Sequence, residues 1–124
     1  MALHIGGGWR KQRGNRGEDL ALDYLRSRGY HVLARNYRFE RGEIDLIAED
    51  GEVIVFVEVK TRRSMKYGQP EHSVTLRKQN QIRKVAEGYL HEHEMRNRPC
   101  RFDVLAITMT YHDPTIIHYR NAFY

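Results

Sequence analysis

Asp45, Glu58 and Lys60 are the residues of this 124-residue chain whose types and spacing could do chemistry. Glu58 and Lys60 lie two positions apart in Val53–Lys60, which has the composition of a β-strand, so side-chain alternation places them on one face as neighbours. Two carboxylates that share a face can hold one divalent cation, because hard cations prefer oxygen ligands. The three residues therefore predict a metal site with a lysine beside it.

The position of Asp45 relative to Glu58 follows from the turn that joins their strands. Asp50-Gly51 is a dipeptide that favours a tight two-residue hairpin, and a turn at these residues places Asp45 opposite Phe56. Opposed residues point to the same face, so we expect Asp45 to lie diagonal to Glu58, with the two backbones roughly 7–8 Å apart. At that separation both carboxylates can reach one ion.

A second interpretation of Val57-Glu58-Val59-Lys60 stays open, in which an exposed strand face carries a weak ion pair. The run Val53–Val57 argues against it, because it is apolar on both strand faces and predicts a central strand that is covered on both sides. Unpaired charge is costly to bury. Charged residues at the end of such a strand therefore favour a functional role.

The elements that must position these residues can be predicted from hydrophobic spacing, capping residues and turns. One amphipathic helix is indicated by an apolar stripe at i, i+3, i+4, i+7 and i+8, formed by Ile82, Val85, Ala86, Tyr89 and Leu90. The expected order is a helix at 15–28, strands at 30–38, 43–49 and 52–60, a helix at 75–94, a strand at 102–109 and a short edge strand at 115–119. Because a strand-helix-strand crossover is right-handed, the strands on either side of the second helix are expected to be parallel. We therefore expect an α/β fold with a mixed sheet in αβββαβ order, flanked by helices.

Charge is distributed unevenly along the chain, whose formal net charge is +5. Residues 1–42 sum to +5, residues 43–60 to −5 and residues 61–101 to +6. Basic flanks around an acidic centre suit a protein that grips a polyanion and keeps its carboxylates in the middle. An ordinary basic protein with one acidic strand pair has the same pattern, and charge alone does not separate the two.

The length of the chain fits one domain, which we expect at residues 15–124 after a flexible basic arm at residues 1–14. Cys100 is the only cysteine, so no internal disulfide can form. The longest apolar run, Val53–Val57, is far shorter than the about 18 residues of a membrane span, and three glycines interrupt the first nine residues, where a signal peptide needs apolar side chains. The expectation is a cytoplasmic protein that does not enter a membrane.

Three segments resemble the YraN family of bacterial proteins, namely Gly42-Glu43-Ile44-Asp45-Leu46-Ile47-Ala48, Val55-Phe56-Val57-Glu58-Val59-Lys60-Thr61-Arg62 and Arg101-Phe102-Asp103-Val104. The resemblance covers nearly the whole chain from Asn15 onward. It implies the restriction-endonuclease-like core shared with archaeal Holliday-junction resolvases, whose PD-(D/E)xK motif falls on Asp45, Glu58 and Lys60. Ile44 stands where the name of the motif has proline, and Glu18 matches an additional helical acid of the resolvases.

The resemblance also implies roles for these residues. Asp45, Glu58 and the main-chain carbonyl of Val59 would hold Mg²⁺ or Mn²⁺. The metal would lower the pKa of a bound water and neutralise charge on the scissile phosphate, while Lys60 would orient the nucleophile or stabilise the transition state. Glu18 has two interpretations, a catalytic acid at the metal or a capping-box residue, because it occupies the third position of a helix that begins at Asn15.

Basic and aromatic residues around the motif are candidates for contacts with nucleic acid. They are Arg13, Arg16, Tyr37, Arg38, Arg62, Arg63, Lys78 and Lys84. For Tyr37 a place in the core is an equal alternative, and the cations of the second helix could equally form an ordinary solvated face.

The preferred interpretation is a metal-dependent endodeoxyribonuclease that hydrolyses phosphodiester bonds in branched or structured DNA. DNA is favoured over RNA as the substrate, and the resolvase resemblance suggests a homodimer. The alternative is a nucleic-acid-binding module that keeps the nuclease fold but has no catalytic activity. The intact set of two acids and a lysine favours catalysis.

Overall fold

The computed structural model of the chain describes residues 16–63, 73–109 and 113–124. Within these ranges the elements are α2 (Arg16–Ser27), β1 (His31–Phe39), β2 (Gly42–Asp50), β3 (Val53–Arg62), α3 (Leu76–Glu92), β4 (Cys100–Thr108) and β5 (Thr115–Phe123). The expected order of elements is confirmed, and β5 is longer than the short edge strand that we expected. The expected basic arm at 1–14, which includes Arg13, lies outside the described residues.

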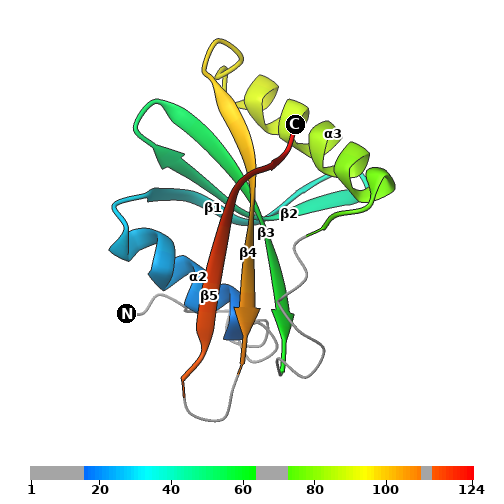
Figure 1. Cartoon of the computed structure of the whole chain (residues 1–124). Helices are drawn as coiled ribbons and strands as arrows, with labels where there is room; N and C mark the ends of the chain where they lie inside the picture. The colour runs from blue at the N-terminus through cyan, green and yellow to red at the C-terminus, as the bar shows by residue number, and fades with distance from the viewer. Residues whose placement is uncertain (1–15, 64–72, 110–112) are drawn as a thin grey trace, which may run out of the picture.

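The five described strands form one mixed sheet in the spatial order β1-β2-β3-β4-β5 (Figure 1). Neighbouring strands are antiparallel except β3 and β4, which are parallel and are joined through α3. This arrangement confirms the crossover that the sequence predicts. Neither described helix is long and apolar enough to cross a membrane.

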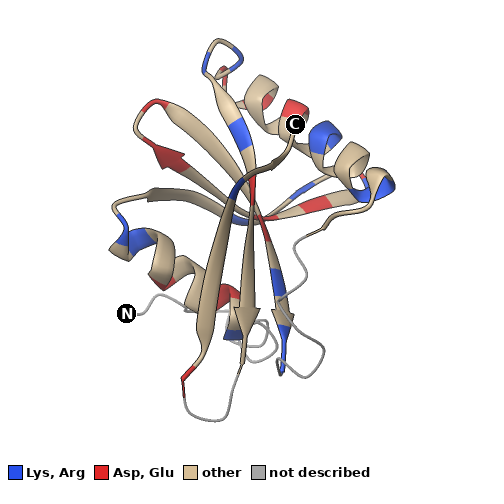
Figure 2. Ribbon diagram, in the orientation of Figure 1, with Lys and Arg blue, Asp and Glu red and all other residues tan. Residues whose placement is uncertain are grey.

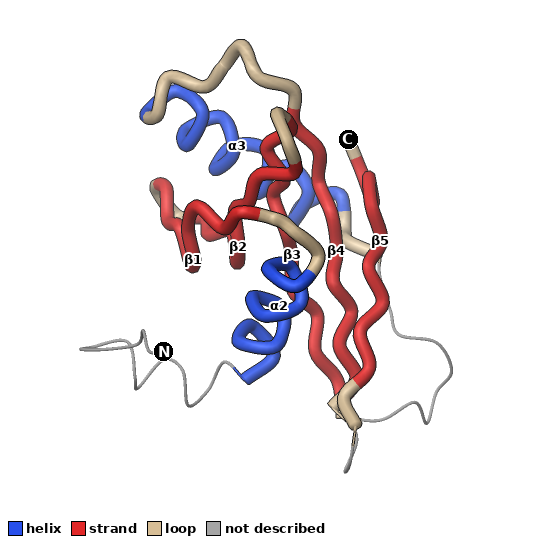
Figure 3. Tube along the Cα trace, turned by 90° about the vertical axis from the view of Figure 1, so that its left-hand side faces the viewer, coloured by secondary structure: helices blue, strands red, loops and turns tan. Residues whose placement is uncertain are grey.

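The central strand β3 is covered on both faces, as its apolar sequence predicts. Val55 and Val57 belong to a buried cluster with α2, whereas Ile54 and Phe56 belong to a buried cluster with α3. All four side chains are at most 1% exposed. The helices therefore cover opposite faces of the sheet, and Figure 3 shows β1 and β2 passing between them.

The turn between β2 and β3 differs from the prediction. Asp50 pairs with Val53, so the two-residue loop is Gly51-Glu52 instead of Asp50-Gly51. Gly51 has a φ of +64°, and Glu52 is not among the described residues with positive φ, so only the first loop position needs the left-handed region. The register shifts by two residues as a result. Phe56 pairs with Ile47, so the expected pairing of Asp45 with Phe56 is wrong, and the observed register ends at Leu46 and Val57, the neighbours of Asp45 and Glu58.

The regular alternation of β2 side chains between the two faces of the sheet is interrupted at Asp45. Ile44 and Ile47 both pack in the α3 cluster although they are three residues apart, while Leu46 packs in the α2 cluster. Asn36, which lies across from Asp45 in the register of β1 and β2, has a φ of +53°. Asparagine tolerates this left-handed conformation better than most residues. The side chains of β2 thus switch from one face of the sheet to the other at one point, and Asp45 lies at that point.

Helix α3 forms where its apolar stripe predicts, because one face of the stripe can be buried against the sheet. Thr75 is the N-cap, and its side chain accepts a hydrogen bond from the Lys78 amide at 3.2 Å. Ile82, Val85 and Tyr89 are at most 3% exposed. The helix ends two residues before the predicted boundary.

A buried ion network fastens β4 to β5 on the far side of β3. The carboxylate of Asp103 is fully buried and lies 2.7 Å from His118 Nε2 and 3.0 Å from Arg101 Nε. The Asn121 amide also donates to it at 3.1 Å, and Arg101 donates to the Tyr30 hydroxyl at 2.6 Å. Burial by itself would raise the pKa of Asp103, but these hydrogen bonds outweigh burial and hold it below its ordinary value.

We predict that Asp103→Ala lowers the free energy of unfolding by about 3–5 kcal/mol at neutral pH, because Arg101 and His118 lose the carboxylate that pairs with them. A depressed carboxyl pKa contributes stability above its unfolded value, near 3.9, and that contribution is lost as the pH falls through the folded value. The difference between variant and wild type should therefore shrink in acid. Urea unfolding at several pH values measures it.

Asp23→Ala on the exposed side of α2 is the matched control, and we expect it to change stability by less than about 0.5 kcal/mol. An Asp103→Ala protein as stable as this control at neutral pH would show that the network does not fasten β5.

Candidate functional site

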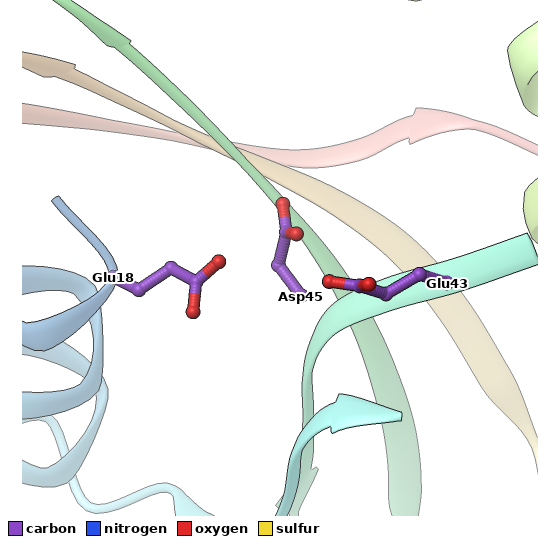
Figure 4. Close-up of side chains that lie close together, drawn as sticks. All are labelled: Glu18, Glu43 and Asp45. Carbon is purple, nitrogen blue, oxygen red and sulfur yellow. The ribbon is translucent and has the colours of Figure 1, made fainter. Parts of the chain in front are cut away.

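Three carboxylates converge beside the point where β2 changes face. Glu18 comes from the first turn of α2, and Glu43 and Asp45 come from β2. One carboxylate oxygen of each lies within 4.8 Å of those of the other two, and all three residues are half-buried. Figure 4 shows Asp45 between the other two side chains. A group of oxygen ligands at this spacing is suited to a hard divalent cation.

Asn36 and Arg35 of β1 hold Glu18 in this position. The Asn36 amide nitrogen donates to both Glu18 oxygens, at 3.0 and 3.1 Å, and to Glu43 Oε2 at 3.1 Å. Arg35 Nε donates to Glu18 Oε1 at 3.3 Å. The Glu18 carboxylate is therefore directed at the strands and the acidic cluster. Asn15, the expected partner of a capping box, lies outside the described residues.

The neighbouring strand holds Asp45 in place, while the charges of the surrounding acids repel its carboxylate. Its Oδ2 accepts a hydrogen bond from the Val59 amide of β3 at 2.8 Å. Burial and the nearby charge of Glu58 raise the pKa of Asp45 to about 7, and Glu18 and Glu43 add to the repulsion. The single hydrogen bond from Val59 opposes these effects without cancelling them.

Glu58 lies against Asp45 and between two lysines. Burial raises the pKa of Glu58, whereas the charge of Lys78, a hydrogen bond from the Asp45 carboxyl and the charge of Lys60 lower it, leaving the pKa above its ordinary value. Lys78 Nζ lies 3.8 Å from the Glu58 carboxylate, whose side chain is 16% exposed. The Asp45 and Glu58 carboxyls can thus share a proton in the metal-free protein.

Lys60 follows Glu58 by two residues at the end of β3, where the sequence places it. Its ammonium group donates to the main-chain carbonyl of Ser73, which precedes α3. Lys60 is close enough to Glu58 for its charge to lower the pKa of that carboxyl. The lysine therefore lies beside the carboxylates and is tethered to the segment that leads into α3.

Val59 presents its backbone to the cluster. The N–H and C=O of one strand residue point to the same side, and the Val59 N–H points to Asp45. The Val59 carbonyl therefore emerges on that side as well. The role of this carbonyl as a metal ligand stays a prediction.

Glu43 is a site residue that sequence reasoning did not select. The signal was present, because residues two apart on a strand share a face and Glu43 precedes Asp45 by two. Arg38, one of the predicted nucleic-acid contacts, pairs with Glu43 at 3.1 Å while its own side chain stays 71% exposed. This places a solvent-facing guanidinium at the rim of the acidic cluster.

The remaining predicted contacts lie in different surroundings. Tyr37 packs edge-on against Tyr89 and donates to Glu92 at 2.6 Å, and burial together with that hydrogen bond raises its pKa to about 12. It packs against the α3 cluster, so its partly buried ring supports the core interpretation. The other described candidates are Arg16 at the start of α2, Arg62 at the end of β3, Arg63 directly after it, and Lys78 and Lys84 on α3. Figure 2 shows basic residues at the end of β3 and on α3.

We predict that Asp45→Asn is more stable than the wild type at pH 8 in chelator, by at least about 1 kcal/mol, or about 4 °C in Tm. Folding raises the Asp45 pKa from 3.8 to about 7, so the stabilising contribution of the protonated carboxyl is complete below the unfolded value and lost as the pH rises through 7. The advantage of the variant should therefore grow between pH 5 and pH 8. Thermal melts across this range measure it.

Mn²⁺ should stabilise the wild type more than Asp45→Asn, by about 2.7 kcal/mol at a hundred times its dissociation constant. Asp23→Asn on the exposed side of α2 should respond to pH and to Mn²⁺ as the wild type does. A destabilised Asp45→Asn beside a wild type that ignores Mn²⁺ would contradict a metal site at Asp45.

Comparison with known proteins identifies the family. The model of the uncharacterised protein family UPF0102 matches residues 17–107. A UPF0102 protein of Geobacter sulfurreducens is 48% identical over 124 residues, which cover 99% of this chain and 97% of the relative. A UPF0102 protein of Dictyoglomus turgidum is 46% identical over 100 residues, which cover 81% of this chain and 85% of the relative. The chain therefore belongs to the uncharacterised family UPF0102, the YraN family, as its sequence motifs predict.

Proposed function

We propose that this protein is a metal-dependent endonuclease with a restriction-endonuclease-like core, and that it acts on branched or otherwise structured DNA. The observation that carries the proposal is the group of half-buried carboxylates around Asp45, with Lys60 beside it at the end of the central strand. The order of elements and the mixed sheet support the same core. Membership of an uncharacterised family does not by itself assign an activity.

The residues present fit a divalent cation. Carboxylates that repel one another and have raised pKa values are a local excess of negative charge, which a cation would neutralise. Asp45, Glu58 and the Val59 carbonyl would hold Mg²⁺ or Mn²⁺, with Glu18 and Glu43 completing the oxygen set. The ion would supply an acidified water as the nucleophile and charge neutralisation at the scissile phosphate.

The two lysines of the site have separate tasks in this proposal. Lys60 at the end of β3 would orient the attacking water or stabilise the charge that develops on the phosphate. Lys78 approaches Glu58 from α3, so it would compensate that carboxylate while no metal is bound. Arg38 at the rim of the acidic cluster would bind an adjacent phosphate of the DNA.

A non-catalytic nucleic-acid-binding module is the second candidate function. The observation in its favour is that Lys60 donates to the Ser73 carbonyl and Lys78 lies against Glu58, so both ammonium groups are engaged within the protein. Catalysis requires that Lys60 exchange this partner for the substrate. A homodimer that spaces two such sites remains part of the nuclease proposal through the resolvase resemblance.

We predict that Glu58→Ala and Lys60→Ala each abolish Mn²⁺-dependent cleavage of a panel of forked, flapped and four-way DNA junctions. Both variants should bind these DNAs in chelator within about threefold of the wild type, because exposed cations at other positions supply most of the affinity. Gel analysis of labelled DNA measures cleavage, and fluorescence anisotropy measures binding.

Arg77→Ala, which removes an exposed cation from α3, is the control that should keep cleavage. Cleavage by Glu58→Ala at the wild-type rate would remove Glu58 from the site. DNA binding by the wild type with no cleavage of any substrate in Mn²⁺ or Mg²⁺ would favour the binding module instead.

A further inference from the structure

A groove between the β1–β2 turn and α3 lies beside the acidic cluster and is separate from it. It has a volume of about 690 Å³, in the range of pockets that hold small organic ligands. Its walls come from the turn at Glu40–Gly42 and from the first half of α3. Gly42 lines the groove and is followed directly by Glu43 of the acidic cluster.

Two glycines allow the turn to approach the helix this closely. A Cβ on Gly42 would lie 2.5 Å from a methyl group of Val85, and a Cβ on Gly88 would lie 2.5 Å from the ring of Phe39. Neither approach is compatible with a larger residue without movement of the packed side chain. The turn that forms one wall of the groove is therefore held close to α3.

The chemistry of the lining changes from the floor to the rim. Phe39 and the buried Val85 supply an apolar floor. Asn80 and Gln81 supply side-chain amides, and Asn80 accepts a hydrogen bond from Arg83 with its oxygen, so its amide nitrogen is the group that can donate to a ligand. The rim carries the cations Arg41 and Lys84.

This gradient matches the three parts of a nucleotide. An apolar surface suits the face of a base, amides suit its hydrogen-bonding edge, and cations suit the phosphate. Glu40 pairs with Lys84 at 3.9 Å with both side chains more than half exposed, so this ion pair is weak and yields readily to a phosphate.

The groove lies a short distance along α3 from the acidic cluster. Lys78 lies against Glu58, and Lys84 follows it by six residues on the same helix, which is about 9 Å along the axis. A DNA strand with a phosphate at the acidic cluster can therefore place a nearby nucleotide at the groove.

We propose that this groove binds one unpaired nucleotide of the DNA strand, close to the scissile phosphate. The inference rests on the proposed function and names its substrate class: DNA with a single-stranded segment beside the cleaved bond, as in a fork, flap or branch. A base within duplex DNA is paired and stacked, and extracting it costs a few kcal/mol. An already unpaired base enters the groove without that cost.

The test is a binding experiment that does not depend on cleavage. Wild-type protein in chelator is titrated with forked DNAs that carry one abasic site, moved by one position at a time along the single-stranded arm. Base stacking contributes about 1–3 kcal/mol per base, so we expect one position where the missing base weakens binding about tenfold. Fluorescence anisotropy measures the affinity.

The groove is assigned by a mutant cycle between protein and DNA. In Asn80→Ala/Gln81→Ala, whose replaced side chains are exposed, the abasic penalty should fall from about tenfold to about threefold, because the amides that bind the base edge are gone and only the apolar contact with the base remains. Lys84→Met serves as a second groove variant and should also weaken binding. Arg77→Ala, an exposed cation of α3 that does not line the groove, should keep the full penalty.

The outcomes of this cycle separate the two proposals. An abasic penalty below twofold at every position, or one that persists in full in the amide variant, would overturn the nucleotide groove whatever the enzyme cleaves. A penalty that falls to about threefold in the amide variant supports the groove even if no metal supports cleavage, and in that case only the nuclease proposal fails. Circular dichroism melts confirm that each variant is folded.

Discussion

The repulsion among half-buried carboxylates at Asp45 is the constraint around which the candidate site is built. Asp45 stands where β2 changes face, so its carboxylate is turned away from both apolar clusters and toward Glu18, Glu43 and Glu58. The sheet can carry this concentration of charge because surrounding contacts hold each group. The Val59 amide, Asn36 and Lys78 supply those contacts without neutralising the cluster.

Two aspartates of the same sheet, the buried Asp103 and the half-buried Asp45, illustrate how partners decide the role of a charge. Asp103 accepts hydrogen bonds from Arg101, His118 and a backbone amide, which hold its pKa below the ordinary value despite burial. Asp45 accepts one backbone hydrogen bond and faces other acids, so its pKa rises to about 7. A charge whose hydrogen-bond partners are complete is typical of a structural role. A charge that lacks such partners and lies in an accessible cluster is typical of a functional site.

The order of elements, the two-faced central strand and α3 could be predicted because each depends on local spacing. Val53–Val57 is apolar at every position, which only a strand covered on both faces tolerates, and the stripe from Ile82 to Tyr89 has the helical period. The three chemistry-bearing residues were likewise visible, since alternation along one strand makes Glu58 and Lys60 neighbours.

The sequence by itself determined the family, the mixed α/β order and the acid-acid-lysine set of this protein. The tertiary structure decided how these acids meet. The Gly51-Glu52 turn moves the register by two residues, and Asn36 in the left-handed region resets the faces of β1 and β2. The turn and the left-handed residue both depend on how the strands and helices bury their apolar sides together. No local sequence pattern specifies this packing. For the same reason the groove between the β1–β2 turn and α3, and the place of Glu43 in the acidic cluster, emerged only from the folded chain.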